Sequence, residues 1–188
     1  MSYLEKAFDA LNEKLGLRTK DRFLNEAKEK DVKELRKSQK EVIDDLVKIT
    51  QSMRKLKGKV EEFKEKYDTL APVAMEILKS IDMAGIRVGK ALVFVKTSNI
   101  SSPSFAKVIE VVQDKLTPKI AKLLQETYEK LKIDRGPSVQ VKEGVNEGIK
   151  EILDGIGAWI HDKFKAGMNA VFGDLDLIDA AIKEAQKA

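Results

Sequence analysis

The residues that could carry out catalysis in this chain of 188 residues are few and isolated. His161 is the only histidine and there is no cysteine, which excludes zinc catalysis and cysteine–histidine catalysis. His161 lies beside Asp162 in a polar stretch, so we expect it on the surface. Glu143, Glu147 and Glu151 recur every four residues and could hold a hard cation, but such a stripe is typical of a solvated helix face. We therefore expect no catalytic residue, no metal site and no cofactor, and we predict that the chain is not an enzyme.

A cluster of basic residues is a candidate binding site for phosphate groups. Between Leu46 and Val60 the sequence has five basic residues and no acidic one. Such a cluster can bind the phosphates of lipid or nucleic acid, or it can pair with acidic residues of a neighbouring helix. The net charge of +4 comes from 35 basic and 31 acidic residues that are intermixed, so nucleic-acid binding is not expected. The possible lipid or phosphate contacts are Lys48, Arg54, Lys55, Lys57 and Lys59.

Trp159 lies in a second segment that could reach a lipid surface, and it completes the set of possible lipid contacts. Residues 155–168 place Trp159, Ile160 and Phe164 on one apolar face, as an interfacial helix requires. The segment resembles the magainin-type membrane-active peptides in its Gly-Ile-Gly opening and its amphipathic lysine and phenylalanine pattern, although Asp162 departs from that pattern. The resemblance implies membrane binding; the other interpretation is a bundle helix with a buried tryptophan.

The strongest pattern is a heptad repeat between residues 32 and 70. With Val32 at position a, all but one of the a and d positions are apolar, and Gln39 is the exception. This spacing predicts a long coiled-coil helix over about residues 20–70. Its partner strip could come from residues 103–134 and 138–171 folding back, from a second copy of the chain, or from both. The seam residues expected to associate are Val32, Leu35, Val42, Leu46, Ile49, Met53, Leu56, Val60 and Phe63.

Pro72 should kink or end this helix, because proline cannot donate a helical hydrogen bond. The apolar repeat keeps its phase beyond Pro72, so we expect a kink or a tight break followed by a helix to about residue 96. Residues 73–95 are apolar outside the seam as well. A helix that is apolar on most sides is usually buried, and we expect this one at the centre of the fold.

The sequence predicts helices in the rest of the chain as well. Ser102-Pro103 and Thr117-Pro118 are helix-start signals, and Gly136-Pro137 is a break. Gly173 should end one helix and Asp174 should cap the next. The expected fold class is all-α, an elongated helical bundle with kinks near Pro72 and Pro118. Its single domain comprises an amphipathic helix at 1–17, a long kinked helix at 19–96, a kinked helix at 102–135, a glycine-containing helix at 138–172 and a terminal helix at 174–187.

These patterns favour a non-catalytic structural or interaction protein that acts through coiled-coil association with a protein partner or with itself as a homo-oligomer. The alternative is a protein that binds an anionic membrane surface. By fold-level analogy alone, that protein would be BAR-like, or it would be an amphipathic and possibly pore-forming helical protein. The chain has neither a signal-peptide pattern nor a spanning apolar segment, so a cytoplasmic or other intracellular location is expected.

Overall fold

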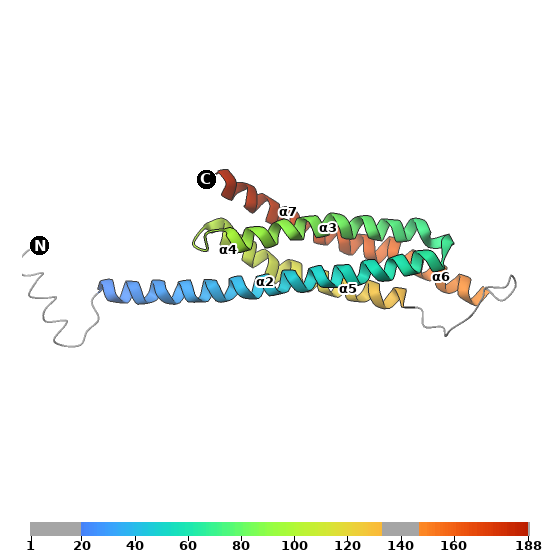
Figure 1. Ribbon diagram of the computed structural model, residues 1–188, viewed down its shortest axis with the longest axis horizontal. Helices are drawn as coiled ribbons and strands as arrows, with labels where there is room; N and C mark the ends of the chain where they lie inside the picture. The colour runs from blue at the N-terminus through green and yellow to red at the C-terminus, as the bar shows by residue number, and fades with distance from the viewer. Residues whose placement is uncertain (1–19, 133–146, 188) are drawn as a thin grey trace, which may run out of the picture.

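The computed structural model describes residues 20–132 and 147–187, and every regular element in these ranges is helical (Figure 1). Side chains are described for residues 28–132 and 150–187. The elements are α2 (Lys20–Lys66), the short 3-10 helix η1 (Asp68–Leu70), α3 (Ala71–Thr97), α4 (Pro103–Glu110), the π-helix η2 (Val111–Leu116), α5 (Thr117–Leu131), α6 (Glu147–Trp159), the π-helix η3 (Ile160–Phe164) and α7 (Lys165–Lys187). The predicted all-α bundle is confirmed.

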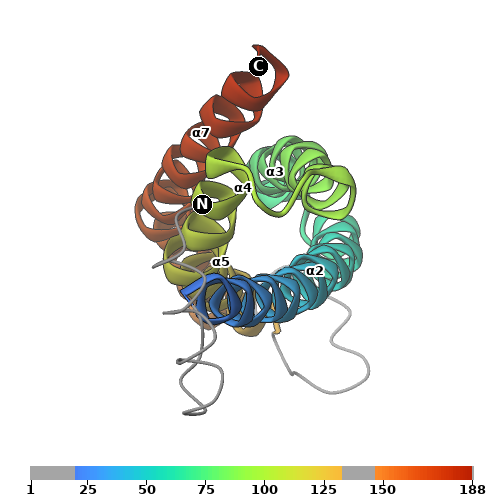
Figure 2. The same cartoon turned by 90° about the vertical axis from the view of Figure 1, so that its left-hand side faces the viewer.

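The helices pack in a ring around one core. α2 packs against α3, α3 against α7, α7 against α4 and α5, and α5 against α2. Figure 2, which looks along the molecule, shows α2, α3, α7 and α5 around a common centre, with α3 across from α5. Each helix therefore needs to bury only the side that faces this centre.

The expected break near Pro72 is present, but it turns the chain back on itself. Pro72 stands in the first turn of α3, where its missing N–H costs no hydrogen bond. The Gln39 side chain donates to the Val95 carbonyl at 2.8 Å, and Lys57 pairs with Asp82 at 3.0 Å. These pairs show that α2 and α3 run antiparallel, so the expected helix over 19–96 is a hairpin of two helices rather than one bent rod. Both helices turn their apolar repeat toward the same core, so the repeat alone does not reveal the reversal.

The start of α4 and the region of Pro118 agree with the sequence. Ser102 caps α4 by accepting a hydrogen bond from the backbone N–H of Phe105 at 3.1 Å. Helix α4 continues through η2 into α5, and the Thr117 N–H bonds to the carbonyl of Val112. This wider turn ends at Thr117, and Pro118 then sits in the first turn of α5. The α-helical pattern is therefore interrupted just before Pro118, although the helix does not end there.

The expected break at Gly173 and Asp174 is wrong, because α7 runs through both residues from Lys165 to Lys187. The Asp174 side chain is buried and accepts two hydrogen bonds from Nζ of Lys119, at 3.0 and 3.2 Å. A lysine of α5 thus satisfies this carboxylate, which leaves no need for it to cap a new helix. The expected helix at 1–17 and the start of that at 138–172 lie outside the described residues.

The chain's own helices bury most of the seam. Its two N-terminal members, Val32 and Leu35, are only partly buried. The next seam residue, Gln39, donates a hydrogen bond from its side-chain amide to the Val95 carbonyl of α3. The helices that cover the seam from Val42 onward therefore belong to the same chain. These buried seam residues cannot contact a second copy while the fold is intact. The buried seam members are Val42, Leu46, Ile49, Met53, Leu56, Val60, Phe63 and Leu70.

Helix α3 differs from the expectation that it is buried on most sides. One stripe faces the core, and four large apolar side chains outside this stripe are half or more exposed. The reason is the ring: α3 has neighbours only on its core side and flanks. The exposed side chains are Met75, Met83, Ile86 and Val93; the buried stripe is Ala74, Ile77, Ile81, Ala84, Val88, Ala91 and Val95.

Candidate functional site

The residues that could have served catalysis are not brought together. His161 is exposed, and its Nδ1 lies 3.1 Å from a carboxylate oxygen of Asp162. Glu151 is exposed, and the side chains of Glu143 and Glu147 lie outside the described set. Within the described parts of the chain, no three histidine or acidic side chains are grouped so that they could hold a metal ion.

The basic cluster is split between different sides of α2. Lys57 points to α3 and pairs with Asp82, and this hydrogen bond raises the pKa of Lys57. Lys59 pairs within its own helix with Glu62 at 3.3 Å. Lys55 instead lines a hollow with Gln125 and Tyr128 of α5. Lys48 and Arg54 are exposed. The cluster therefore does not form one cationic surface, because residues that are close in sequence point in different directions from a helix.

Trp159 is partly buried at the junction of α6 and η3. Its ring lies under the Lys130 ammonium, with Nζ 5.9 Å from the ring centroid. The indole lines an open groove of about 660 Å³, together with Gln125, Glu126, Glu129 and Lys163. Trp159 and Lys55 thus flank different sides of α5, and both hollows include Gln125. The tryptophan contributes to packing between helices, and its expected lipid-facing apolar companions Ile160 and Phe164 are buried in the core.

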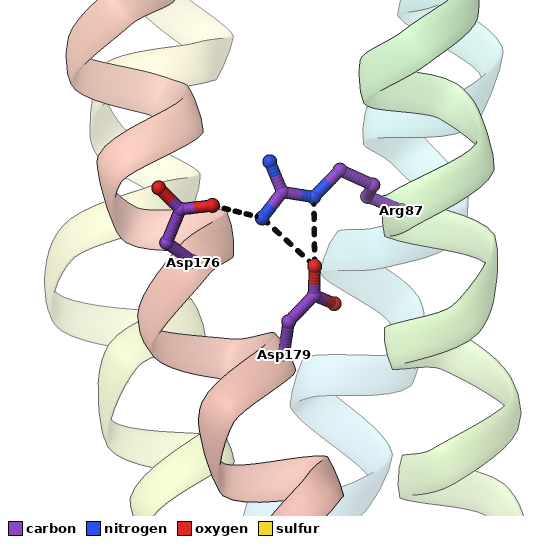
Figure 3. A network of polar contacts seen from close by, with 3 residues as sticks. All are labelled: Arg87, Asp176 and Asp179. Carbon is purple, nitrogen blue, oxygen red and sulfur yellow. Dashed lines mark hydrogen bonds and ion pairs between the residues drawn. The ribbon is translucent and has the colours of Figure 1, made fainter.

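A charged network joins α3 to α7 (Figure 3). The Arg87 guanidinium donates from Nε to Asp179 at 2.9 Å and from Nη2 to Asp176. Its Nη2 also forms an ion pair with Asp179 at 2.8 Å. Arg87 also lies over the Phe172 ring, 5.8 Å from its centroid. Burial lowers the pKa of Arg87, but the hydrogen bonds to the two aspartates outweigh burial and raise it overall. The network joins the two helices through one guanidinium and two carboxylates.

Among the residues whose side chains are described, the most exposed large apolar side chains lie on the outward side of α3. We call Met75, Met83, Ile86 and Val93 the outer α3 face; they are 51, 50, 65 and 61% exposed. Their helical positions lie away from the buried stripe, a signal that is readable from the sequence once the core side is known. The sequence pattern did not predict this surface, because apolar residues outside the seam are also typical of a buried helix.

The second uncovered surface is the part of α2 that extends past the other helices. Gln39 bonds to Val95, two residues before α3 ends at Thr97, so most of residues 28–38 of α2 run beyond the end of α3. Figure 1 shows this part of α2 (blue) projecting from the bundle. We call residues 28–38 the α2 arm. It carries the first two seam residues, Val32 and Leu35, both partly exposed.

Comparisons with protein-family models, with curated protein sequences and with solved structures find no match to this chain. None of the helices in the described residues is long and apolar enough to cross a lipid bilayer. The candidate sites therefore rest on the geometry of the outer α3 face and the α2 arm.

Proposed function

We propose that this chain is a non-catalytic helical protein that acts by associating with other helices, with the α2 arm as its first contact. The observation that carries the proposal is the continuation of the heptad seam beyond the bundle, with Val32 and Leu35 partly exposed. Apolar side chains at the a and d positions of a projecting helix are unfavourably exposed to water. A second helix can bury them by knobs-into-holes packing, which lowers the free energy of the pair.

The charges of the α2 arm suit a helical partner. Between residues 28 and 38 there are five basic side chains (Lys28, Lys30, Lys33, Arg36, Lys37) and three acidic ones (Glu29, Asp31, Glu34). Charges of both signs beside an apolar seam set the alignment of a partner helix more than they add affinity. A second copy of the arm meets this requirement, because it carries both signs as well.

The test replaces Val32 and Leu35 together with serine. We expect the dissociation constant of self-association, measured by sedimentation velocity, to rise about tenfold or more, because two apolar side chains lose their burial. The matched control is Lys33→Ser with Arg36→Ser, which lowers the helix propensity of the same segment at least as much but leaves the seam intact. Equal dissociation constants for the two variants, or a wild-type chain that is monomeric throughout, would contradict the proposal.

Binding to an anionic membrane surface is the second candidate function. It is supported by the outer α3 face, whose apolar side chains lie near the exposed Lys79 and Lys90. In that case the protein floats with anionic vesicles but not with neutral ones, and Ile86→Ser with Val93→Ser abolishes flotation. Ile152→Ser with Leu177→Ser is the control, since both are exposed apolar residues elsewhere. Flotation that is insensitive to the α3 change would exclude this surface.

A further inference from the structure

Two of the charges beside the outer α3 face are not paired within the described part of the chain. Asp82 pairs with Lys57, and Arg87 pairs with two aspartates of α7. Glu76 and Lys90 are exposed, and neither has an ion-pair partner among the residues whose side chains are described. These two opposite charges are therefore available to another molecule.

Glu76, Met83 and Lys90 are evenly spaced along α3. Seven residues separate each from the next. Seven residues make two helical turns less about 20°, so the three side chains lie nearly in line on one side of the helix. Met83 is 50% exposed at the middle, with opposite charges at equal distances on either side. A twofold axis through Met83 and perpendicular to α3 would place each Glu76 beside the partner's Lys90.

We propose that the outer α3 face binds a second copy of this chain, with the two α3 helices antiparallel and Met83 at the twofold axis. Both charge pairs form at once, because a twofold interface uses the same patch on both copies. Met83 packs against the partner's Met83, and Ile86, three residues further on, packs against the alkyl stem of the partner's Lys79. Antiparallel packing brings two helix axes to about 8–10 Å, close enough for these contacts.

A second copy fits this face better than lipid does. The face carries Glu76 and Asp82 as well as Lys79 and Lys90, all of them exposed. Carboxylates are repelled by an anionic bilayer, whereas in the antiparallel pair Glu76 meets a cation. The face also lacks the tryptophan or phenylalanine that is typical of interfacial helices, and methionine is enriched at protein interfaces. The inference goes beyond the α2 arm, since it uses a different helix.

The test reverses the two charges singly and together. Glu76→Lys and Lys90→Glu each place like charges opposite one another in both pairs, and we expect each to weaken dimerisation about tenfold in sedimentation velocity. The double variant Glu76→Lys with Lys90→Glu restores both pairs in reverse, and we expect it to return to within about threefold of wild type. A double variant no tighter than the single variants would overturn the proposed register.

Site-specific cross-linking tests the same contact without changing a charge. The chain has no cysteine, so a single introduced cysteine reports one position. Met83→Cys is expected to give a covalent dimer with a short bismaleimide reagent. Ala121→Cys, exposed on α5 across the bundle, is expected to remain monomeric. Equal yields from the two variants, or no dimer from Met83→Cys, would overturn the inference.

The failure of this inference can be told apart from the failure of the proposed function. Cross-linking of Met83→Cys in the background of Val32→Ser and Leu35→Ser isolates the outer α3 face, because the α2 arm is then disabled. Loss of self-association in the arm variant without a Met83 cross-link would leave the arm as the contact and reject the α3 pairing. Flotation with anionic vesicles that Lys90→Glu weakens and Glu76→Lys strengthens would assign the face to lipid and equally reject the pairing.

Discussion

Replacing both Leu46 and Leu56 with aspartate is expected to unfold this chain. The two side chains are 0 and 1% exposed, and they face the core that α2 shares with the other helices. Each change removes a leucine, which costs about 2–5 kcal/mol as a cavity, and leaves a carboxylate without a partner in an apolar site. The combined cost of the two substitutions is comparable to the whole free energy of unfolding of a typical domain, roughly 5–15 kcal/mol. Circular dichroism should show loss of helix and no cooperative melting transition.

The matched control for this pair is Gln51→Asp with Ser52→Asp. Both positions are exposed on the same helix, so the same two charges are added without entering the core. We expect the melting temperature to change by only a few degrees, as surface substitutions usually do. If the leucine variant melts like the control, the burial of the seam within the chain is wrong.

Lys119→Met is expected to have the second largest effect. It removes the cation that donates to both carboxylate oxygens of Asp174, whose side chain is 7% exposed. An ionised carboxylate left unpaired at that depth costs its desolvation free energy, and we expect the free energy of unfolding to fall by about 2–3 kcal/mol in urea titrations. Lysine 119 itself is half exposed, which keeps the loss below that of a fully buried pair.

Two further variants test whether the loss comes from the unpaired charge of Asp174. Lys119→Met combined with Asp174→Asn removes the unpaired charge, so the pair should recover much of the loss and reveal a coupling in the double-mutant cycle. Lys122→Met is the control, because Lys122 makes a 3.8 Å surface pair with Glu126 and should cost at most about 0.5 kcal/mol. A Lys119 variant as stable as the Lys122 variant would show that Asp174 does not depend on this lysine.

The sequence predicted the helical fold well and its connections less well. Periodicity identified the seam, and the cap formed by Ser102 was confirmed by its hydrogen bond to Phe105. The reversal before Pro72 could not be distinguished from a kink, because both helices of a hairpin present the same repeat to one core. Gly173 and Asp174 look like a helix boundary locally, and only the distant Lys119 shows why the helix continues.

The candidate surfaces were predicted less well than the fold. A heptad seam states that a partner strip is needed, but it does not state whether the strip is in the same chain. The structure places that strip within the chain for Val42–Phe63 and leaves Val32 and Leu35 on the projecting arm. The outer α3 face was not predicted, since apolar composition alone cannot separate a buried side of a helix from an uncovered one.

The π-helices η2 and η3 have a consequence for how this chain tolerates changes in length. Core residues around them recur every four residues, as in Ile156, Ile160, Phe164 and Met168. Four α-helical residues overshoot a full turn by about 40°, so an unbroken run would spiral away from the core. The wider π turn holds one extra residue and cancels that drift. Each π segment is thus equivalent to a single-residue insertion that the helix has absorbed, whereas α2 is α-helical throughout, and losing one residue there would turn half of its seam toward water.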